Sequence, residues 1–330
     1  MALPVFLKKI GIDAYLIALL GVVALSFVLP ARGVFAEIVG QAAYYAVALL
    51  FFVYGAKLKT EAVVAGFANW RLQAAILAIT YVAFPLFAIA LAFASRDVLP
   101  EELALGLLYI GILPSTVQSS IAFTALAKGN VAAAVCAASV SNLLGVIVTP
   151  LLATLILQAG DGGINGGAVV NIAIQIVLPF ALGQAFRPLI GNWIGKHRLL
   201  SLTVDRGSIL LIVYSAFSAG MVAGIWLEVD AVTLAAIAAI VCLFLVLAIG
   251  ISLGLGRLAQ FAREDNRALL FCGSTKSLAS GVPIANILFA GGPISLIILP
   301  LMLYHQIQLV VCAIIAQRMA VGTEPIGEKP

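Results

Sequence analysis

The chain has 330 residues, of which 63% are hydrophobic and only 10% are charged, and its mean hydropathy is +1.18. This composition excludes a soluble globular enzyme and is typical of a polytopic membrane protein. The formal net charge of +4 does not indicate a nucleic-acid partner, because the excess basic residues lie in short loops on one side of the predicted membrane. We therefore expect a single all-α membrane domain embedded in a lipid bilayer.

Ten apolar segments follow one another along the chain, each close to the ~20 residues that a helix needs to cross the hydrocarbon core. They cover about residues 13–30, 37–56, 72–95, 103–127, 131–157, 168–190, 207–227, 231–255, 268–290 and 293–316. The first segment follows Lys8 and Lys9 but continues to Pro30. We interpret it as an uncleaved first helix rather than a signal peptide.

The basic residues test this segment count, because cytoplasmic loops carry an excess of Lys and Arg. If the N-terminus is cytoplasmic, only Arg32 and Arg96 of the 18 Lys and Arg residues fall on the opposite side, and Lys276 lies within a segment. The remaining fifteen share the side of the N-terminus. Both termini are thus predicted to be cytoplasmic. The protein itself is predicted to lie in a cell membrane, either the plasma membrane or an inner membrane.

Ten spans with both ends inside divide into two sets of five that enter the membrane from opposite sides. This is the plan of an inverted repeat, which is common among transporters, and it predicts one transporter domain with repeats at about 1–159 and 160–330. Two motifs support it weakly. Leu113-Pro114-Ser115-Thr116 in the fourth segment and Cys272-Gly273-Ser274-Thr275 in the ninth occupy corresponding positions, and each places a helix breaker before a Ser-Thr pair.

These two segments are predicted to be broken helices. Pro114 lacks a backbone N–H and disfavours helical geometry at the residue before it, and Gly273 and Pro283 interrupt the ninth segment. We expect a second half-helix to begin near Ser280, with Ser280 as its N-cap. Two interrupted helices in matching positions of two halves point to the substrate site of a transporter.

Lys276 is the most informative residue, because it lies within the apolar segment 268–290. A lysine at this depth costs several kcal/mol on insertion scales, so its presence indicates a function. We expect its ammonium to face a protein-lined cavity, where it and the N-terminus of a half-helix would bind an anion. Burial also favours the neutral amine, so Lys276 is a candidate carrier of a coupling proton. The structural alternative is that the ammonium bonds carbonyl groups and ties the two broken segments together.

The other candidate binding residues carry hydroxyl or amide groups close to the two breaks. The full candidate set is Ser115, Thr116, Gln118, Ser119, Ser120 and Asn142 in the first half and Ser274, Thr275, Lys276, Ser277 and Ser280 in the second. His305 is either a proton relay or a hydrogen-bonded core histidine. No catalytic pair, metal-binding cluster or nucleotide-binding loop is recognisable, so we expect no enzyme activity, no metal and no cofactor.

Several motifs carry a family resemblance over nearly the whole chain. Ile112-Leu113-Pro114, Lys128-Gly129-Asn130 and Thr149-Pro150-Leu151-Leu152 resemble the fourth and fifth helices of the sodium/bile-acid symporter (SBF) family. The run Phe271–Leu278 and Tyr304-His305 resemble the SBF-like branch, typified by solute carrier family 10 member 7. This resemblance implies ten helices in two inverted repeats, with helices 4 and 9 unwound and crossing near the midplane. A core of helices 3–5 and 8–10 would move against a panel of helices 1, 2, 6 and 7, which gives alternating access.

The resemblance also predicts how ion coupling differs from that of the sodium-coupled members. There a carboxylate and nearby amides in the second crossover ligate sodium, whereas Ser274–Ser277 here include a lysine and no carboxylate. In the first crossover, Ser119-Ser120 occupy the positions of the Ser-Asn pair of the sodium-coupled members. On the next helix, Ala134 and Ala138 occupy the positions of their hydroxyl residues. An ammonium nearby would repel a second cation. We therefore expect a secondary transporter of a small organic anion that is coupled to H⁺ or uncoupled, with Na⁺ less favoured.

Two other functions stay open. Because no substrate can be read from the residues, the chain is also compatible with a non-transporting membrane regulator that keeps a transporter fold. A sodium-coupled bile acid symporter proper is the other alternative. A cation/proton antiporter is disfavoured, because such proteins rely on mid-membrane aspartates and the segment assignment contains none.

Overall fold

The structure is a computed structural model that describes residues 14–57, 69–157, 173–224 and 229–321. Within these ranges every regular element is a helix, which confirms the all-α prediction. Seven helical stretches in the described residues are long and apolar enough to span a bilayer: Gly33–Lys57, Trp70–Ala94, Val131–Leu157, Ile174–Lys196, Leu199–Val222, Ala231–Leu258 and Ile294–Ala320. Large side chains such as Phe93, Leu189 and Val246 are exposed on them, as expected of surfaces that face lipid.

The first half of the chain contains one interrupted helix pair. Its elements are α2 (Ala14–Val28), α3 (Gly33–Lys57), α5 (Trp70–Ala78), the π-helical turn η2 (Ile79–Ala83), α6 (Phe84–Ala94), α7 (Glu101–Ile112), α8 (Gln118–Leu126) and α9 (Val131–Leu157). Helix α7 ends before Leu113, whose backbone is extended, and α8 begins at Gln118. The fourth predicted segment is therefore interrupted at the place where Pro114 predicts a break.

The second half contains the other interrupted pair. Its elements are η3 (Ala173–Val177), α11 (Leu178–Lys196), α12 (Arg198–Val222), α13 (Ala231–Leu258), α14 (Arg263–Ser274), α15 (Leu278–Leu288) and α16 (Ile294–Val321). Helix α15 begins three residues earlier than predicted, because Ser277 is its N-cap and accepts a hydrogen bond from the Ser280 N–H at 3.1 Å. The prediction of Ser280 as the cap was wrong.

Helix α12 also begins earlier than the predicted segment 207–227. It starts at Arg198, so Asp205 and Arg206 lie within the helix instead of before it. The predicted segment begins just after these two charged residues, which are unfavourable in hydrocarbon. In the structure both side chains border a cavity, where polar groups have partners other than lipid.

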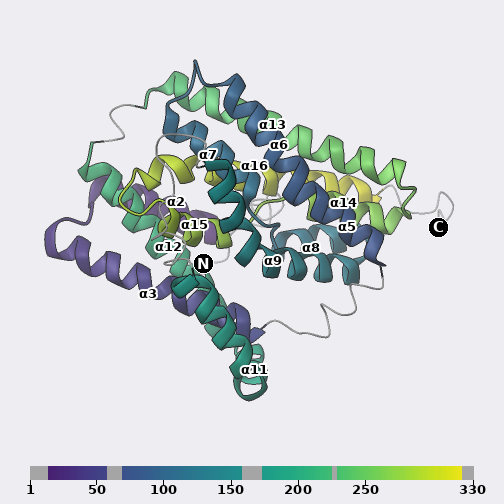
Figure 1. Cartoon of the computed structure of the whole chain (residues 1–330), viewed down its shortest axis with the longest axis horizontal. Helices are drawn as coiled ribbons and strands as arrows, with labels where there is room; N and C mark the ends of the chain where they lie inside the picture. Colours follow the sequence, from purple (N-terminus) through teal and green to yellow (C-terminus); the bar gives the residue numbers. More distant parts are fainter. Residues whose placement is uncertain (1–13, 58–68, 158–172, 225–228, 322–330) are drawn as a thin grey trace, which may run out of the picture.

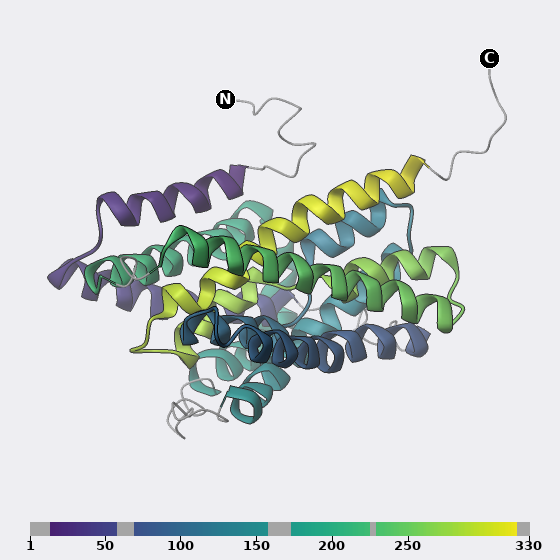
Figure 2. The same cartoon turned by 90° about the horizontal axis from the view of Figure 1, so that it is seen from above.

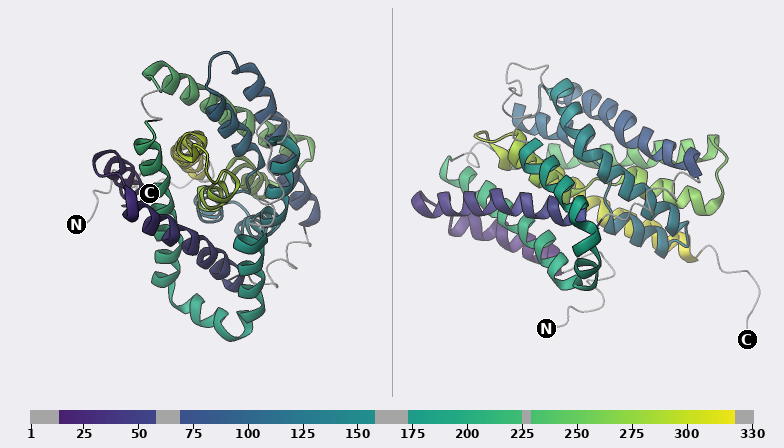
Figure 3. Two further views of the ribbon diagram at one scale, coloured as in Figure 1. Left: turned by 60° about the vertical axis from the view of Figure 1, so that its left-hand side comes forward. Right: turned by 60° about the horizontal axis from the view of Figure 1, so that its bottom comes forward.

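The helices form two groups that pack side by side. Helix α3 packs against α11 and α12, and α12 also packs against α2, while α7 packs against α6 and α16, and α13 against α14. Figure 1 shows α2, α3, α11 and α12 on one side and α5, α6, α13 and α14 on the other. Most helices run along a common direction in Figure 2. In the left view of Figure 3 the olive and yellow ribbons of the last helices lie in the middle, surrounded by the others.

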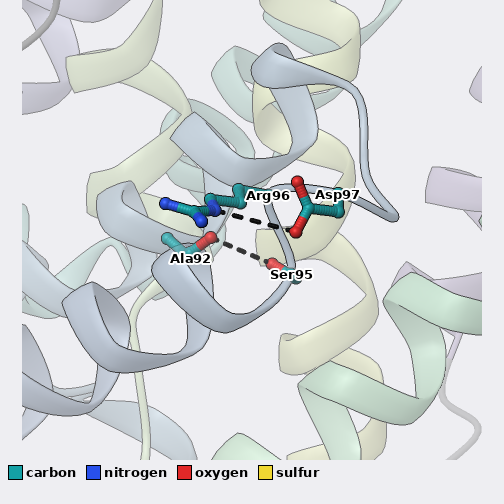
Figure 4. A network of polar contacts seen from close by, with 4 residues as sticks. All are labelled: Ala92, Ser95, Arg96 and Asp97. Carbon is teal, nitrogen blue, oxygen red and sulfur yellow. Dashed lines mark hydrogen bonds and ion pairs between the residues drawn. The ribbon is translucent and has the colours of Figure 1, made fainter.

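The connection after α6 shows how a loop outside the spans is held (Figure 4). The Ser95 hydroxyl donates to the Ala92 carbonyl at 3.3 Å, and Arg96 Nε lies 3.7 Å from Asp97 Oδ2. Both charged side chains are exposed, by 62% and 86%, so their attraction is weak. The Val98 and Leu99 N–H groups both donate to the Ser95 carbonyl at 2.9 Å. Backbone hydrogen bonds therefore hold this turn more firmly than the ion pair does.

Candidate functional site

The two interruptions lie against each other. The Ser277 N–H donates to the Pro114 carbonyl at 3.0 Å, and the Ser115 hydroxyl donates to the Cys272 carbonyl at 2.6 Å. Each bond joins residues more than 150 positions apart in the chain. The non-helical backbone of one break thus satisfies the polar groups of the other, as buried backbone inside a membrane requires.

Hydroxyl side chains complete the pairing of the two breaks. The Thr116 hydroxyl donates to Thr275 Oγ1 at 3.1 Å, and Thr275 in turn donates to the Phe271 carbonyl at 2.7 Å. The Ser274 hydroxyl donates to the Leu270 carbonyl of its own helix, and the Ser120 hydroxyl donates to the Thr116 carbonyl in the first break. The Ser-Thr pairs that follow both helix breakers therefore serve mainly to satisfy backbone and hydroxyl groups where the two breaks meet.

Asn142 connects the two breaks to α9. Its Nδ2 donates to the Ser115 carbonyl at 2.8 Å, and its Oδ1 accepts a hydrogen bond from the Ser280 hydroxyl at 2.9 Å. One side chain on α9 thereby contacts the backbone of the first break and the first turn of α15. We infer that Asn142 fixes the relative position of the two interrupted helices.

Lys276 is fully buried and its ammonium donates to three backbone carbonyls. Nζ lies 3.0 Å from the Thr80 oxygen, 3.2 Å from the Gly111 oxygen and 2.6 Å from the Leu113 oxygen. It also lies 4.0 Å from the centre of the Phe84 ring. An ammonium has three N–H donors, so these carbonyls satisfy it completely without a carboxylate.

The carbonyls that surround Lys276 have a common origin in irregular helix geometry. Gly111 is in the last turn of α7 and Leu113 follows it, where the last carbonyls of a helix lack intrahelical partners and carry partial negative charge. Thr80 lies in η2, a π-helical turn. The expectation that the ammonium faces a cavity is not what the structure shows. The carbonyl-bonding alternative describes its contacts, because the oxygens of Thr80, Gly111 and Leu113 accept its three N–H groups.

The backbone of Lys276 is clamped from α16. Its N–H donates to Gln308 Oε1 at 2.8 Å, and its carbonyl accepts from Gln308 Nε2 at 2.9 Å. His305 Nδ1 lies 3.3 Å from the same carbonyl and 2.9 Å from Gln308 Nε2. His305 is thus a hydrogen-bonded histidine beside the second break, and it also borders the cavity described next.

A cavity of about 620 Å³ separates the two helix groups. One wall comes from α2, α3, α11 and α12 through Tyr15, Phe51, Tyr54, Lys57, Phe180, Asp205, Arg206 and Ile209. The opposite wall comes from both breaks, α9 and α16, and includes Pro114, Thr116, Gln118, Ser119, Asn142, Ser277, Ser280 and His305. A volume of this size accommodates a small organic molecule.

The structure brings only part of the predicted binding set to this cavity. Six of the predicted residues line it: Thr116, Gln118, Ser119, Asn142, Ser277 and Ser280. The other five, Ser115, Ser120, Ser274, Thr275 and Lys276, do not line it and are buried behind its wall. The hydroxyl and amino groups of these five residues bond instead to backbone carbonyls within the core.

Sequence reasoning missed the charged side chains on the other wall. Asp205 Oδ1 accepts a hydrogen bond from the Tyr54 hydroxyl at 2.6 Å, and Oδ2 accepts one from Gln118 Nε2 at 3.4 Å. Lys57 and Arg206 line the same cavity. The available signal was the apolar sequence on both sides of Asp205-Arg206, which begins at Leu199 and places the pair inside a span.

Asn142→Ala is expected to destabilise the protein by about 1–3 kcal/mol, because the Ser115 carbonyl and the Ser280 hydroxyl lose their partner. Thermal unfolding of the detergent-purified protein measures the change. Ser139→Ala is the matched control, because Ser139 lines the same cavity from the same helix but bonds only to the Val135 carbonyl of its own helix. Equal melting temperatures for the two variants would contradict the bridging role of Asn142.

Comparison with known proteins places these features in a family context. A model of the SBF-like CPA transporter family matches residues 13–321. A Pseudomonas aeruginosa protein named "Uncharacterized protein PA2026" is 46% identical, over 97% of this chain and 95% of the relative. An Escherichia coli (strain K12) protein named "Putative symporter YfeH" is 43% identical, over 96% and 95%. The Rattus norvegicus protein named "Sodium/bile acid cotransporter 7" is 30% identical, over 82% and 81%.

Proposed function

Because the chain belongs to the SBF-like CPA transporter family, we propose that it is a secondary transporter of a small organic anion that works by alternating access. The observation that carries the proposal is the cavity of about 620 Å³ between the two helix groups. Both interrupted helices contribute to one of its walls. Interrupted helices that meet at a cavity are a recurring feature of substrate sites in transporters.

The proposed mechanism assigns the helices to two moving parts. The panel consists of α2, α3, α11 and α12, and the core consists of the remaining helices, with α7–α8 and α14–α15 as the broken fourth and ninth spans. In this proposal ten spans form two inverted five-helix repeats, and both termini are cytoplasmic. The boundary between the repeats, at about residue 159, lies outside the described residues. Movement of the core against the panel would expose the cavity alternately to the two sides of the membrane.

The preference for an anion rests on the charges along the panel wall of the cavity. Lys57 and Arg206 contribute two positive charges, and Asp205 contributes one negative charge. The core wall contributes hydroxyl and amide groups, of which Ser119, Asn142 and Ser280 are examples. Such a site favours a substrate with an acidic group, because two cationic side chains line it where solvent is partly excluded.

Lys276 is proposed to act as a built-in cation that takes the place of a bound sodium ion. Its ammonium donates to three carbonyls from η2 and the end of α7, and carbonyl oxygens are also ligands that hard cations prefer. A fixed ammonium would hold the crossing together in every state of the transport cycle. It would also remove the need for sodium, because a second cation at this position is repelled.

Uptake by proteoliposomes tests the proposal. Reconstituted protein is screened with radiolabelled organic anions, including taurocholate, in sodium and in choline buffers and with an imposed pH gradient. We expect saturable uptake of at least one anion at the same rate in both buffers. Uptake that requires sodium would support the sodium-coupled alternative. Absence of uptake for every anion, together with recovery of a tight protein partner in pull-down, would support the regulator.

A further inference from the structure

We propose that Asp205 is the proton-binding group of this transporter and that it binds a proton together with the substrate anion. The inference rests on the proposed function, and it assigns the coupling proton to a residue on the panel instead of to Lys276. Three observations carry it: the position of Asp205 on the cavity, the two cations beside it, and the enclosure of the Lys276 ammonium elsewhere.

The surroundings of Asp205 combine hydrogen bonds with two nearby positive charges. Its carboxylate accepts from the Tyr54 hydroxyl at 2.6 Å and from Gln118 Nε2 at 3.4 Å. Two cations are close enough to interact electrostatically with the Asp205 carboxylate. They are Lys57, at the end of α3, and Arg206, which follows Asp205 in the chain. The other titratable groups that border the cavity in the described residues are Tyr15 of α2 and His305 of α16.

A substrate anion would compete with Asp205 for the same cations. An anion in the cavity would place a second negative group near the Asp205 carboxylate in a partly desolvated space, where like charges repel strongly. Protonation of Asp205 removes one of these negative groups. Binding of the anion therefore favours binding of the proton, and by thermodynamic linkage the proton favours the anion by the same factor.

Neither of the other internal bases fits this role as well. The ammonium of Lys276 is fully buried, does not line the cavity and donates to three carbonyls, so a proton has no short path to it from the substrate. His305 Nδ1 lies 3.3 Å from the Lys276 carbonyl and 2.9 Å from Gln308 Nε2, so this nitrogen is already engaged by partners in the core. Asp205 is the carboxylate on the cavity wall within the described residues.

Infrared titration of the purified protein tests the charge coupling without any substrate. The carboxylic acid C=O band is recorded from about pH 4 to about pH 9 for wild type, Asp205→Asn and Lys57→Gln. We expect Asp205→Asn to remove one titrating component from the wild-type spectra. In Lys57→Gln this component should titrate at least half a pH unit higher, because one stabilising cation is gone. An unchanged midpoint in Lys57→Gln, or no component lost in Asp205→Asn, would overturn the inference.

Transport in vesicles loaded with the pH dye pyranine provides the second readout. We expect taurocholate, whose sulfonate stays charged over this range, or another anion accepted in the screen, to enter the wild-type vesicles with protons. The apparent affinity for the anion should rise by up to about tenfold per pH unit of acidification, and Asp205→Asn should lose this dependence. Anion uptake without proton entry would refute the role of Asp205 and leave the proposed function intact. Absence of all uptake would refute the proposed function and, with it, the joint binding of proton and anion, and the infrared titration would then decide only whether Asp205 is a carboxylate whose titration responds to Lys57.

Discussion

Lys276→Met is expected to lower the melting temperature of the detergent-purified protein by on the order of 10 °C and to abolish anion uptake. Methionine keeps an unbranched side chain but provides no donor for the oxygens of Thr80, Gly111 and Leu113. Leaving these buried acceptors without the ammonium costs about 2–5 kcal/mol. The loss falls where η2, the end of α7 and the second break meet, so the relative position of these segments changes with it.

Thr80→Val is the matched control for Lys276→Met. The Thr80 hydroxyl donates to the Ile76 carbonyl of its own helix at 2.8 Å, so valine removes a buried polar group at the same location and leaves the backbone acceptor of Lys276 in place. We expect a change of about 1 kcal/mol or less in the free energy of unfolding. A Lys276→Met protein as stable and as active as Thr80→Val would contradict the role of the ammonium.

Lys276→Ala separates the cation role of this residue from simple packing. Alanine leaves room beside the three carbonyls, and a sodium ion in that space would meet oxygen ligands of the kind that hard cations prefer. We expect sodium chloride to raise the melting temperature of Lys276→Ala relative to choline chloride at equal ionic strength, and to leave the wild-type value unchanged. Equal values in the two salts would indicate that the ammonium does not substitute for a bound ion.

The elements of the fold could be predicted because their signals are local. Apolar segments of membrane-spanning length predicted the long helices, and Pro114 predicted the break after α7. The ninth segment was predicted to break near Gly273, one residue before the observed end of α14 at Ser274. In each case the residues that determine the feature are adjacent in the chain, so no tertiary contact is needed to recognise it.

The direction of the Lys276 side chain could not be predicted in this way. It depends on three carbonyls contributed by residues 163 to 196 positions away, and on the fact that α7 ends beside the second break. Asp205 is a comparable case, since its partners Tyr54 and Gln118 lie on α3 and α8. Polar residues in the membrane acquire their roles from partners that are distant in the sequence. Sequence patterns therefore locate the site more reliably than they predict which atoms contact each other in it.

Gly183→Ala is expected to destabilise the protein strongly, because α3 and α11 touch through their backbones. A Cβ atom at Gly183 would lie 2.0 Å from the Phe52 carbonyl oxygen, and one at Gly55 would lie 2.1 Å from the Phe180 oxygen. Small residues allow such close helix packing in membranes. Since backbone atoms cannot move aside singly, the two helices must separate, at a cost of about 3 kcal/mol. We expect less folded protein by size-exclusion chromatography and a lower melting temperature.

Gly250→Ala is the matched control for this prediction, because the same substitution should have the opposite sign there. Gly250 lies within α13, and a Cβ atom added to it meets nothing within 4 Å. Alanine is favoured over glycine inside a helix by about 1 kcal/mol, so Gly250→Ala should be neutral or slightly stabilising. If Gly183→Ala behaved in the same way, the panel would have to tolerate separation of α3 and α11. Contacts other than those between α3 and α11 would then have to keep the panel rigid while the core moves against it.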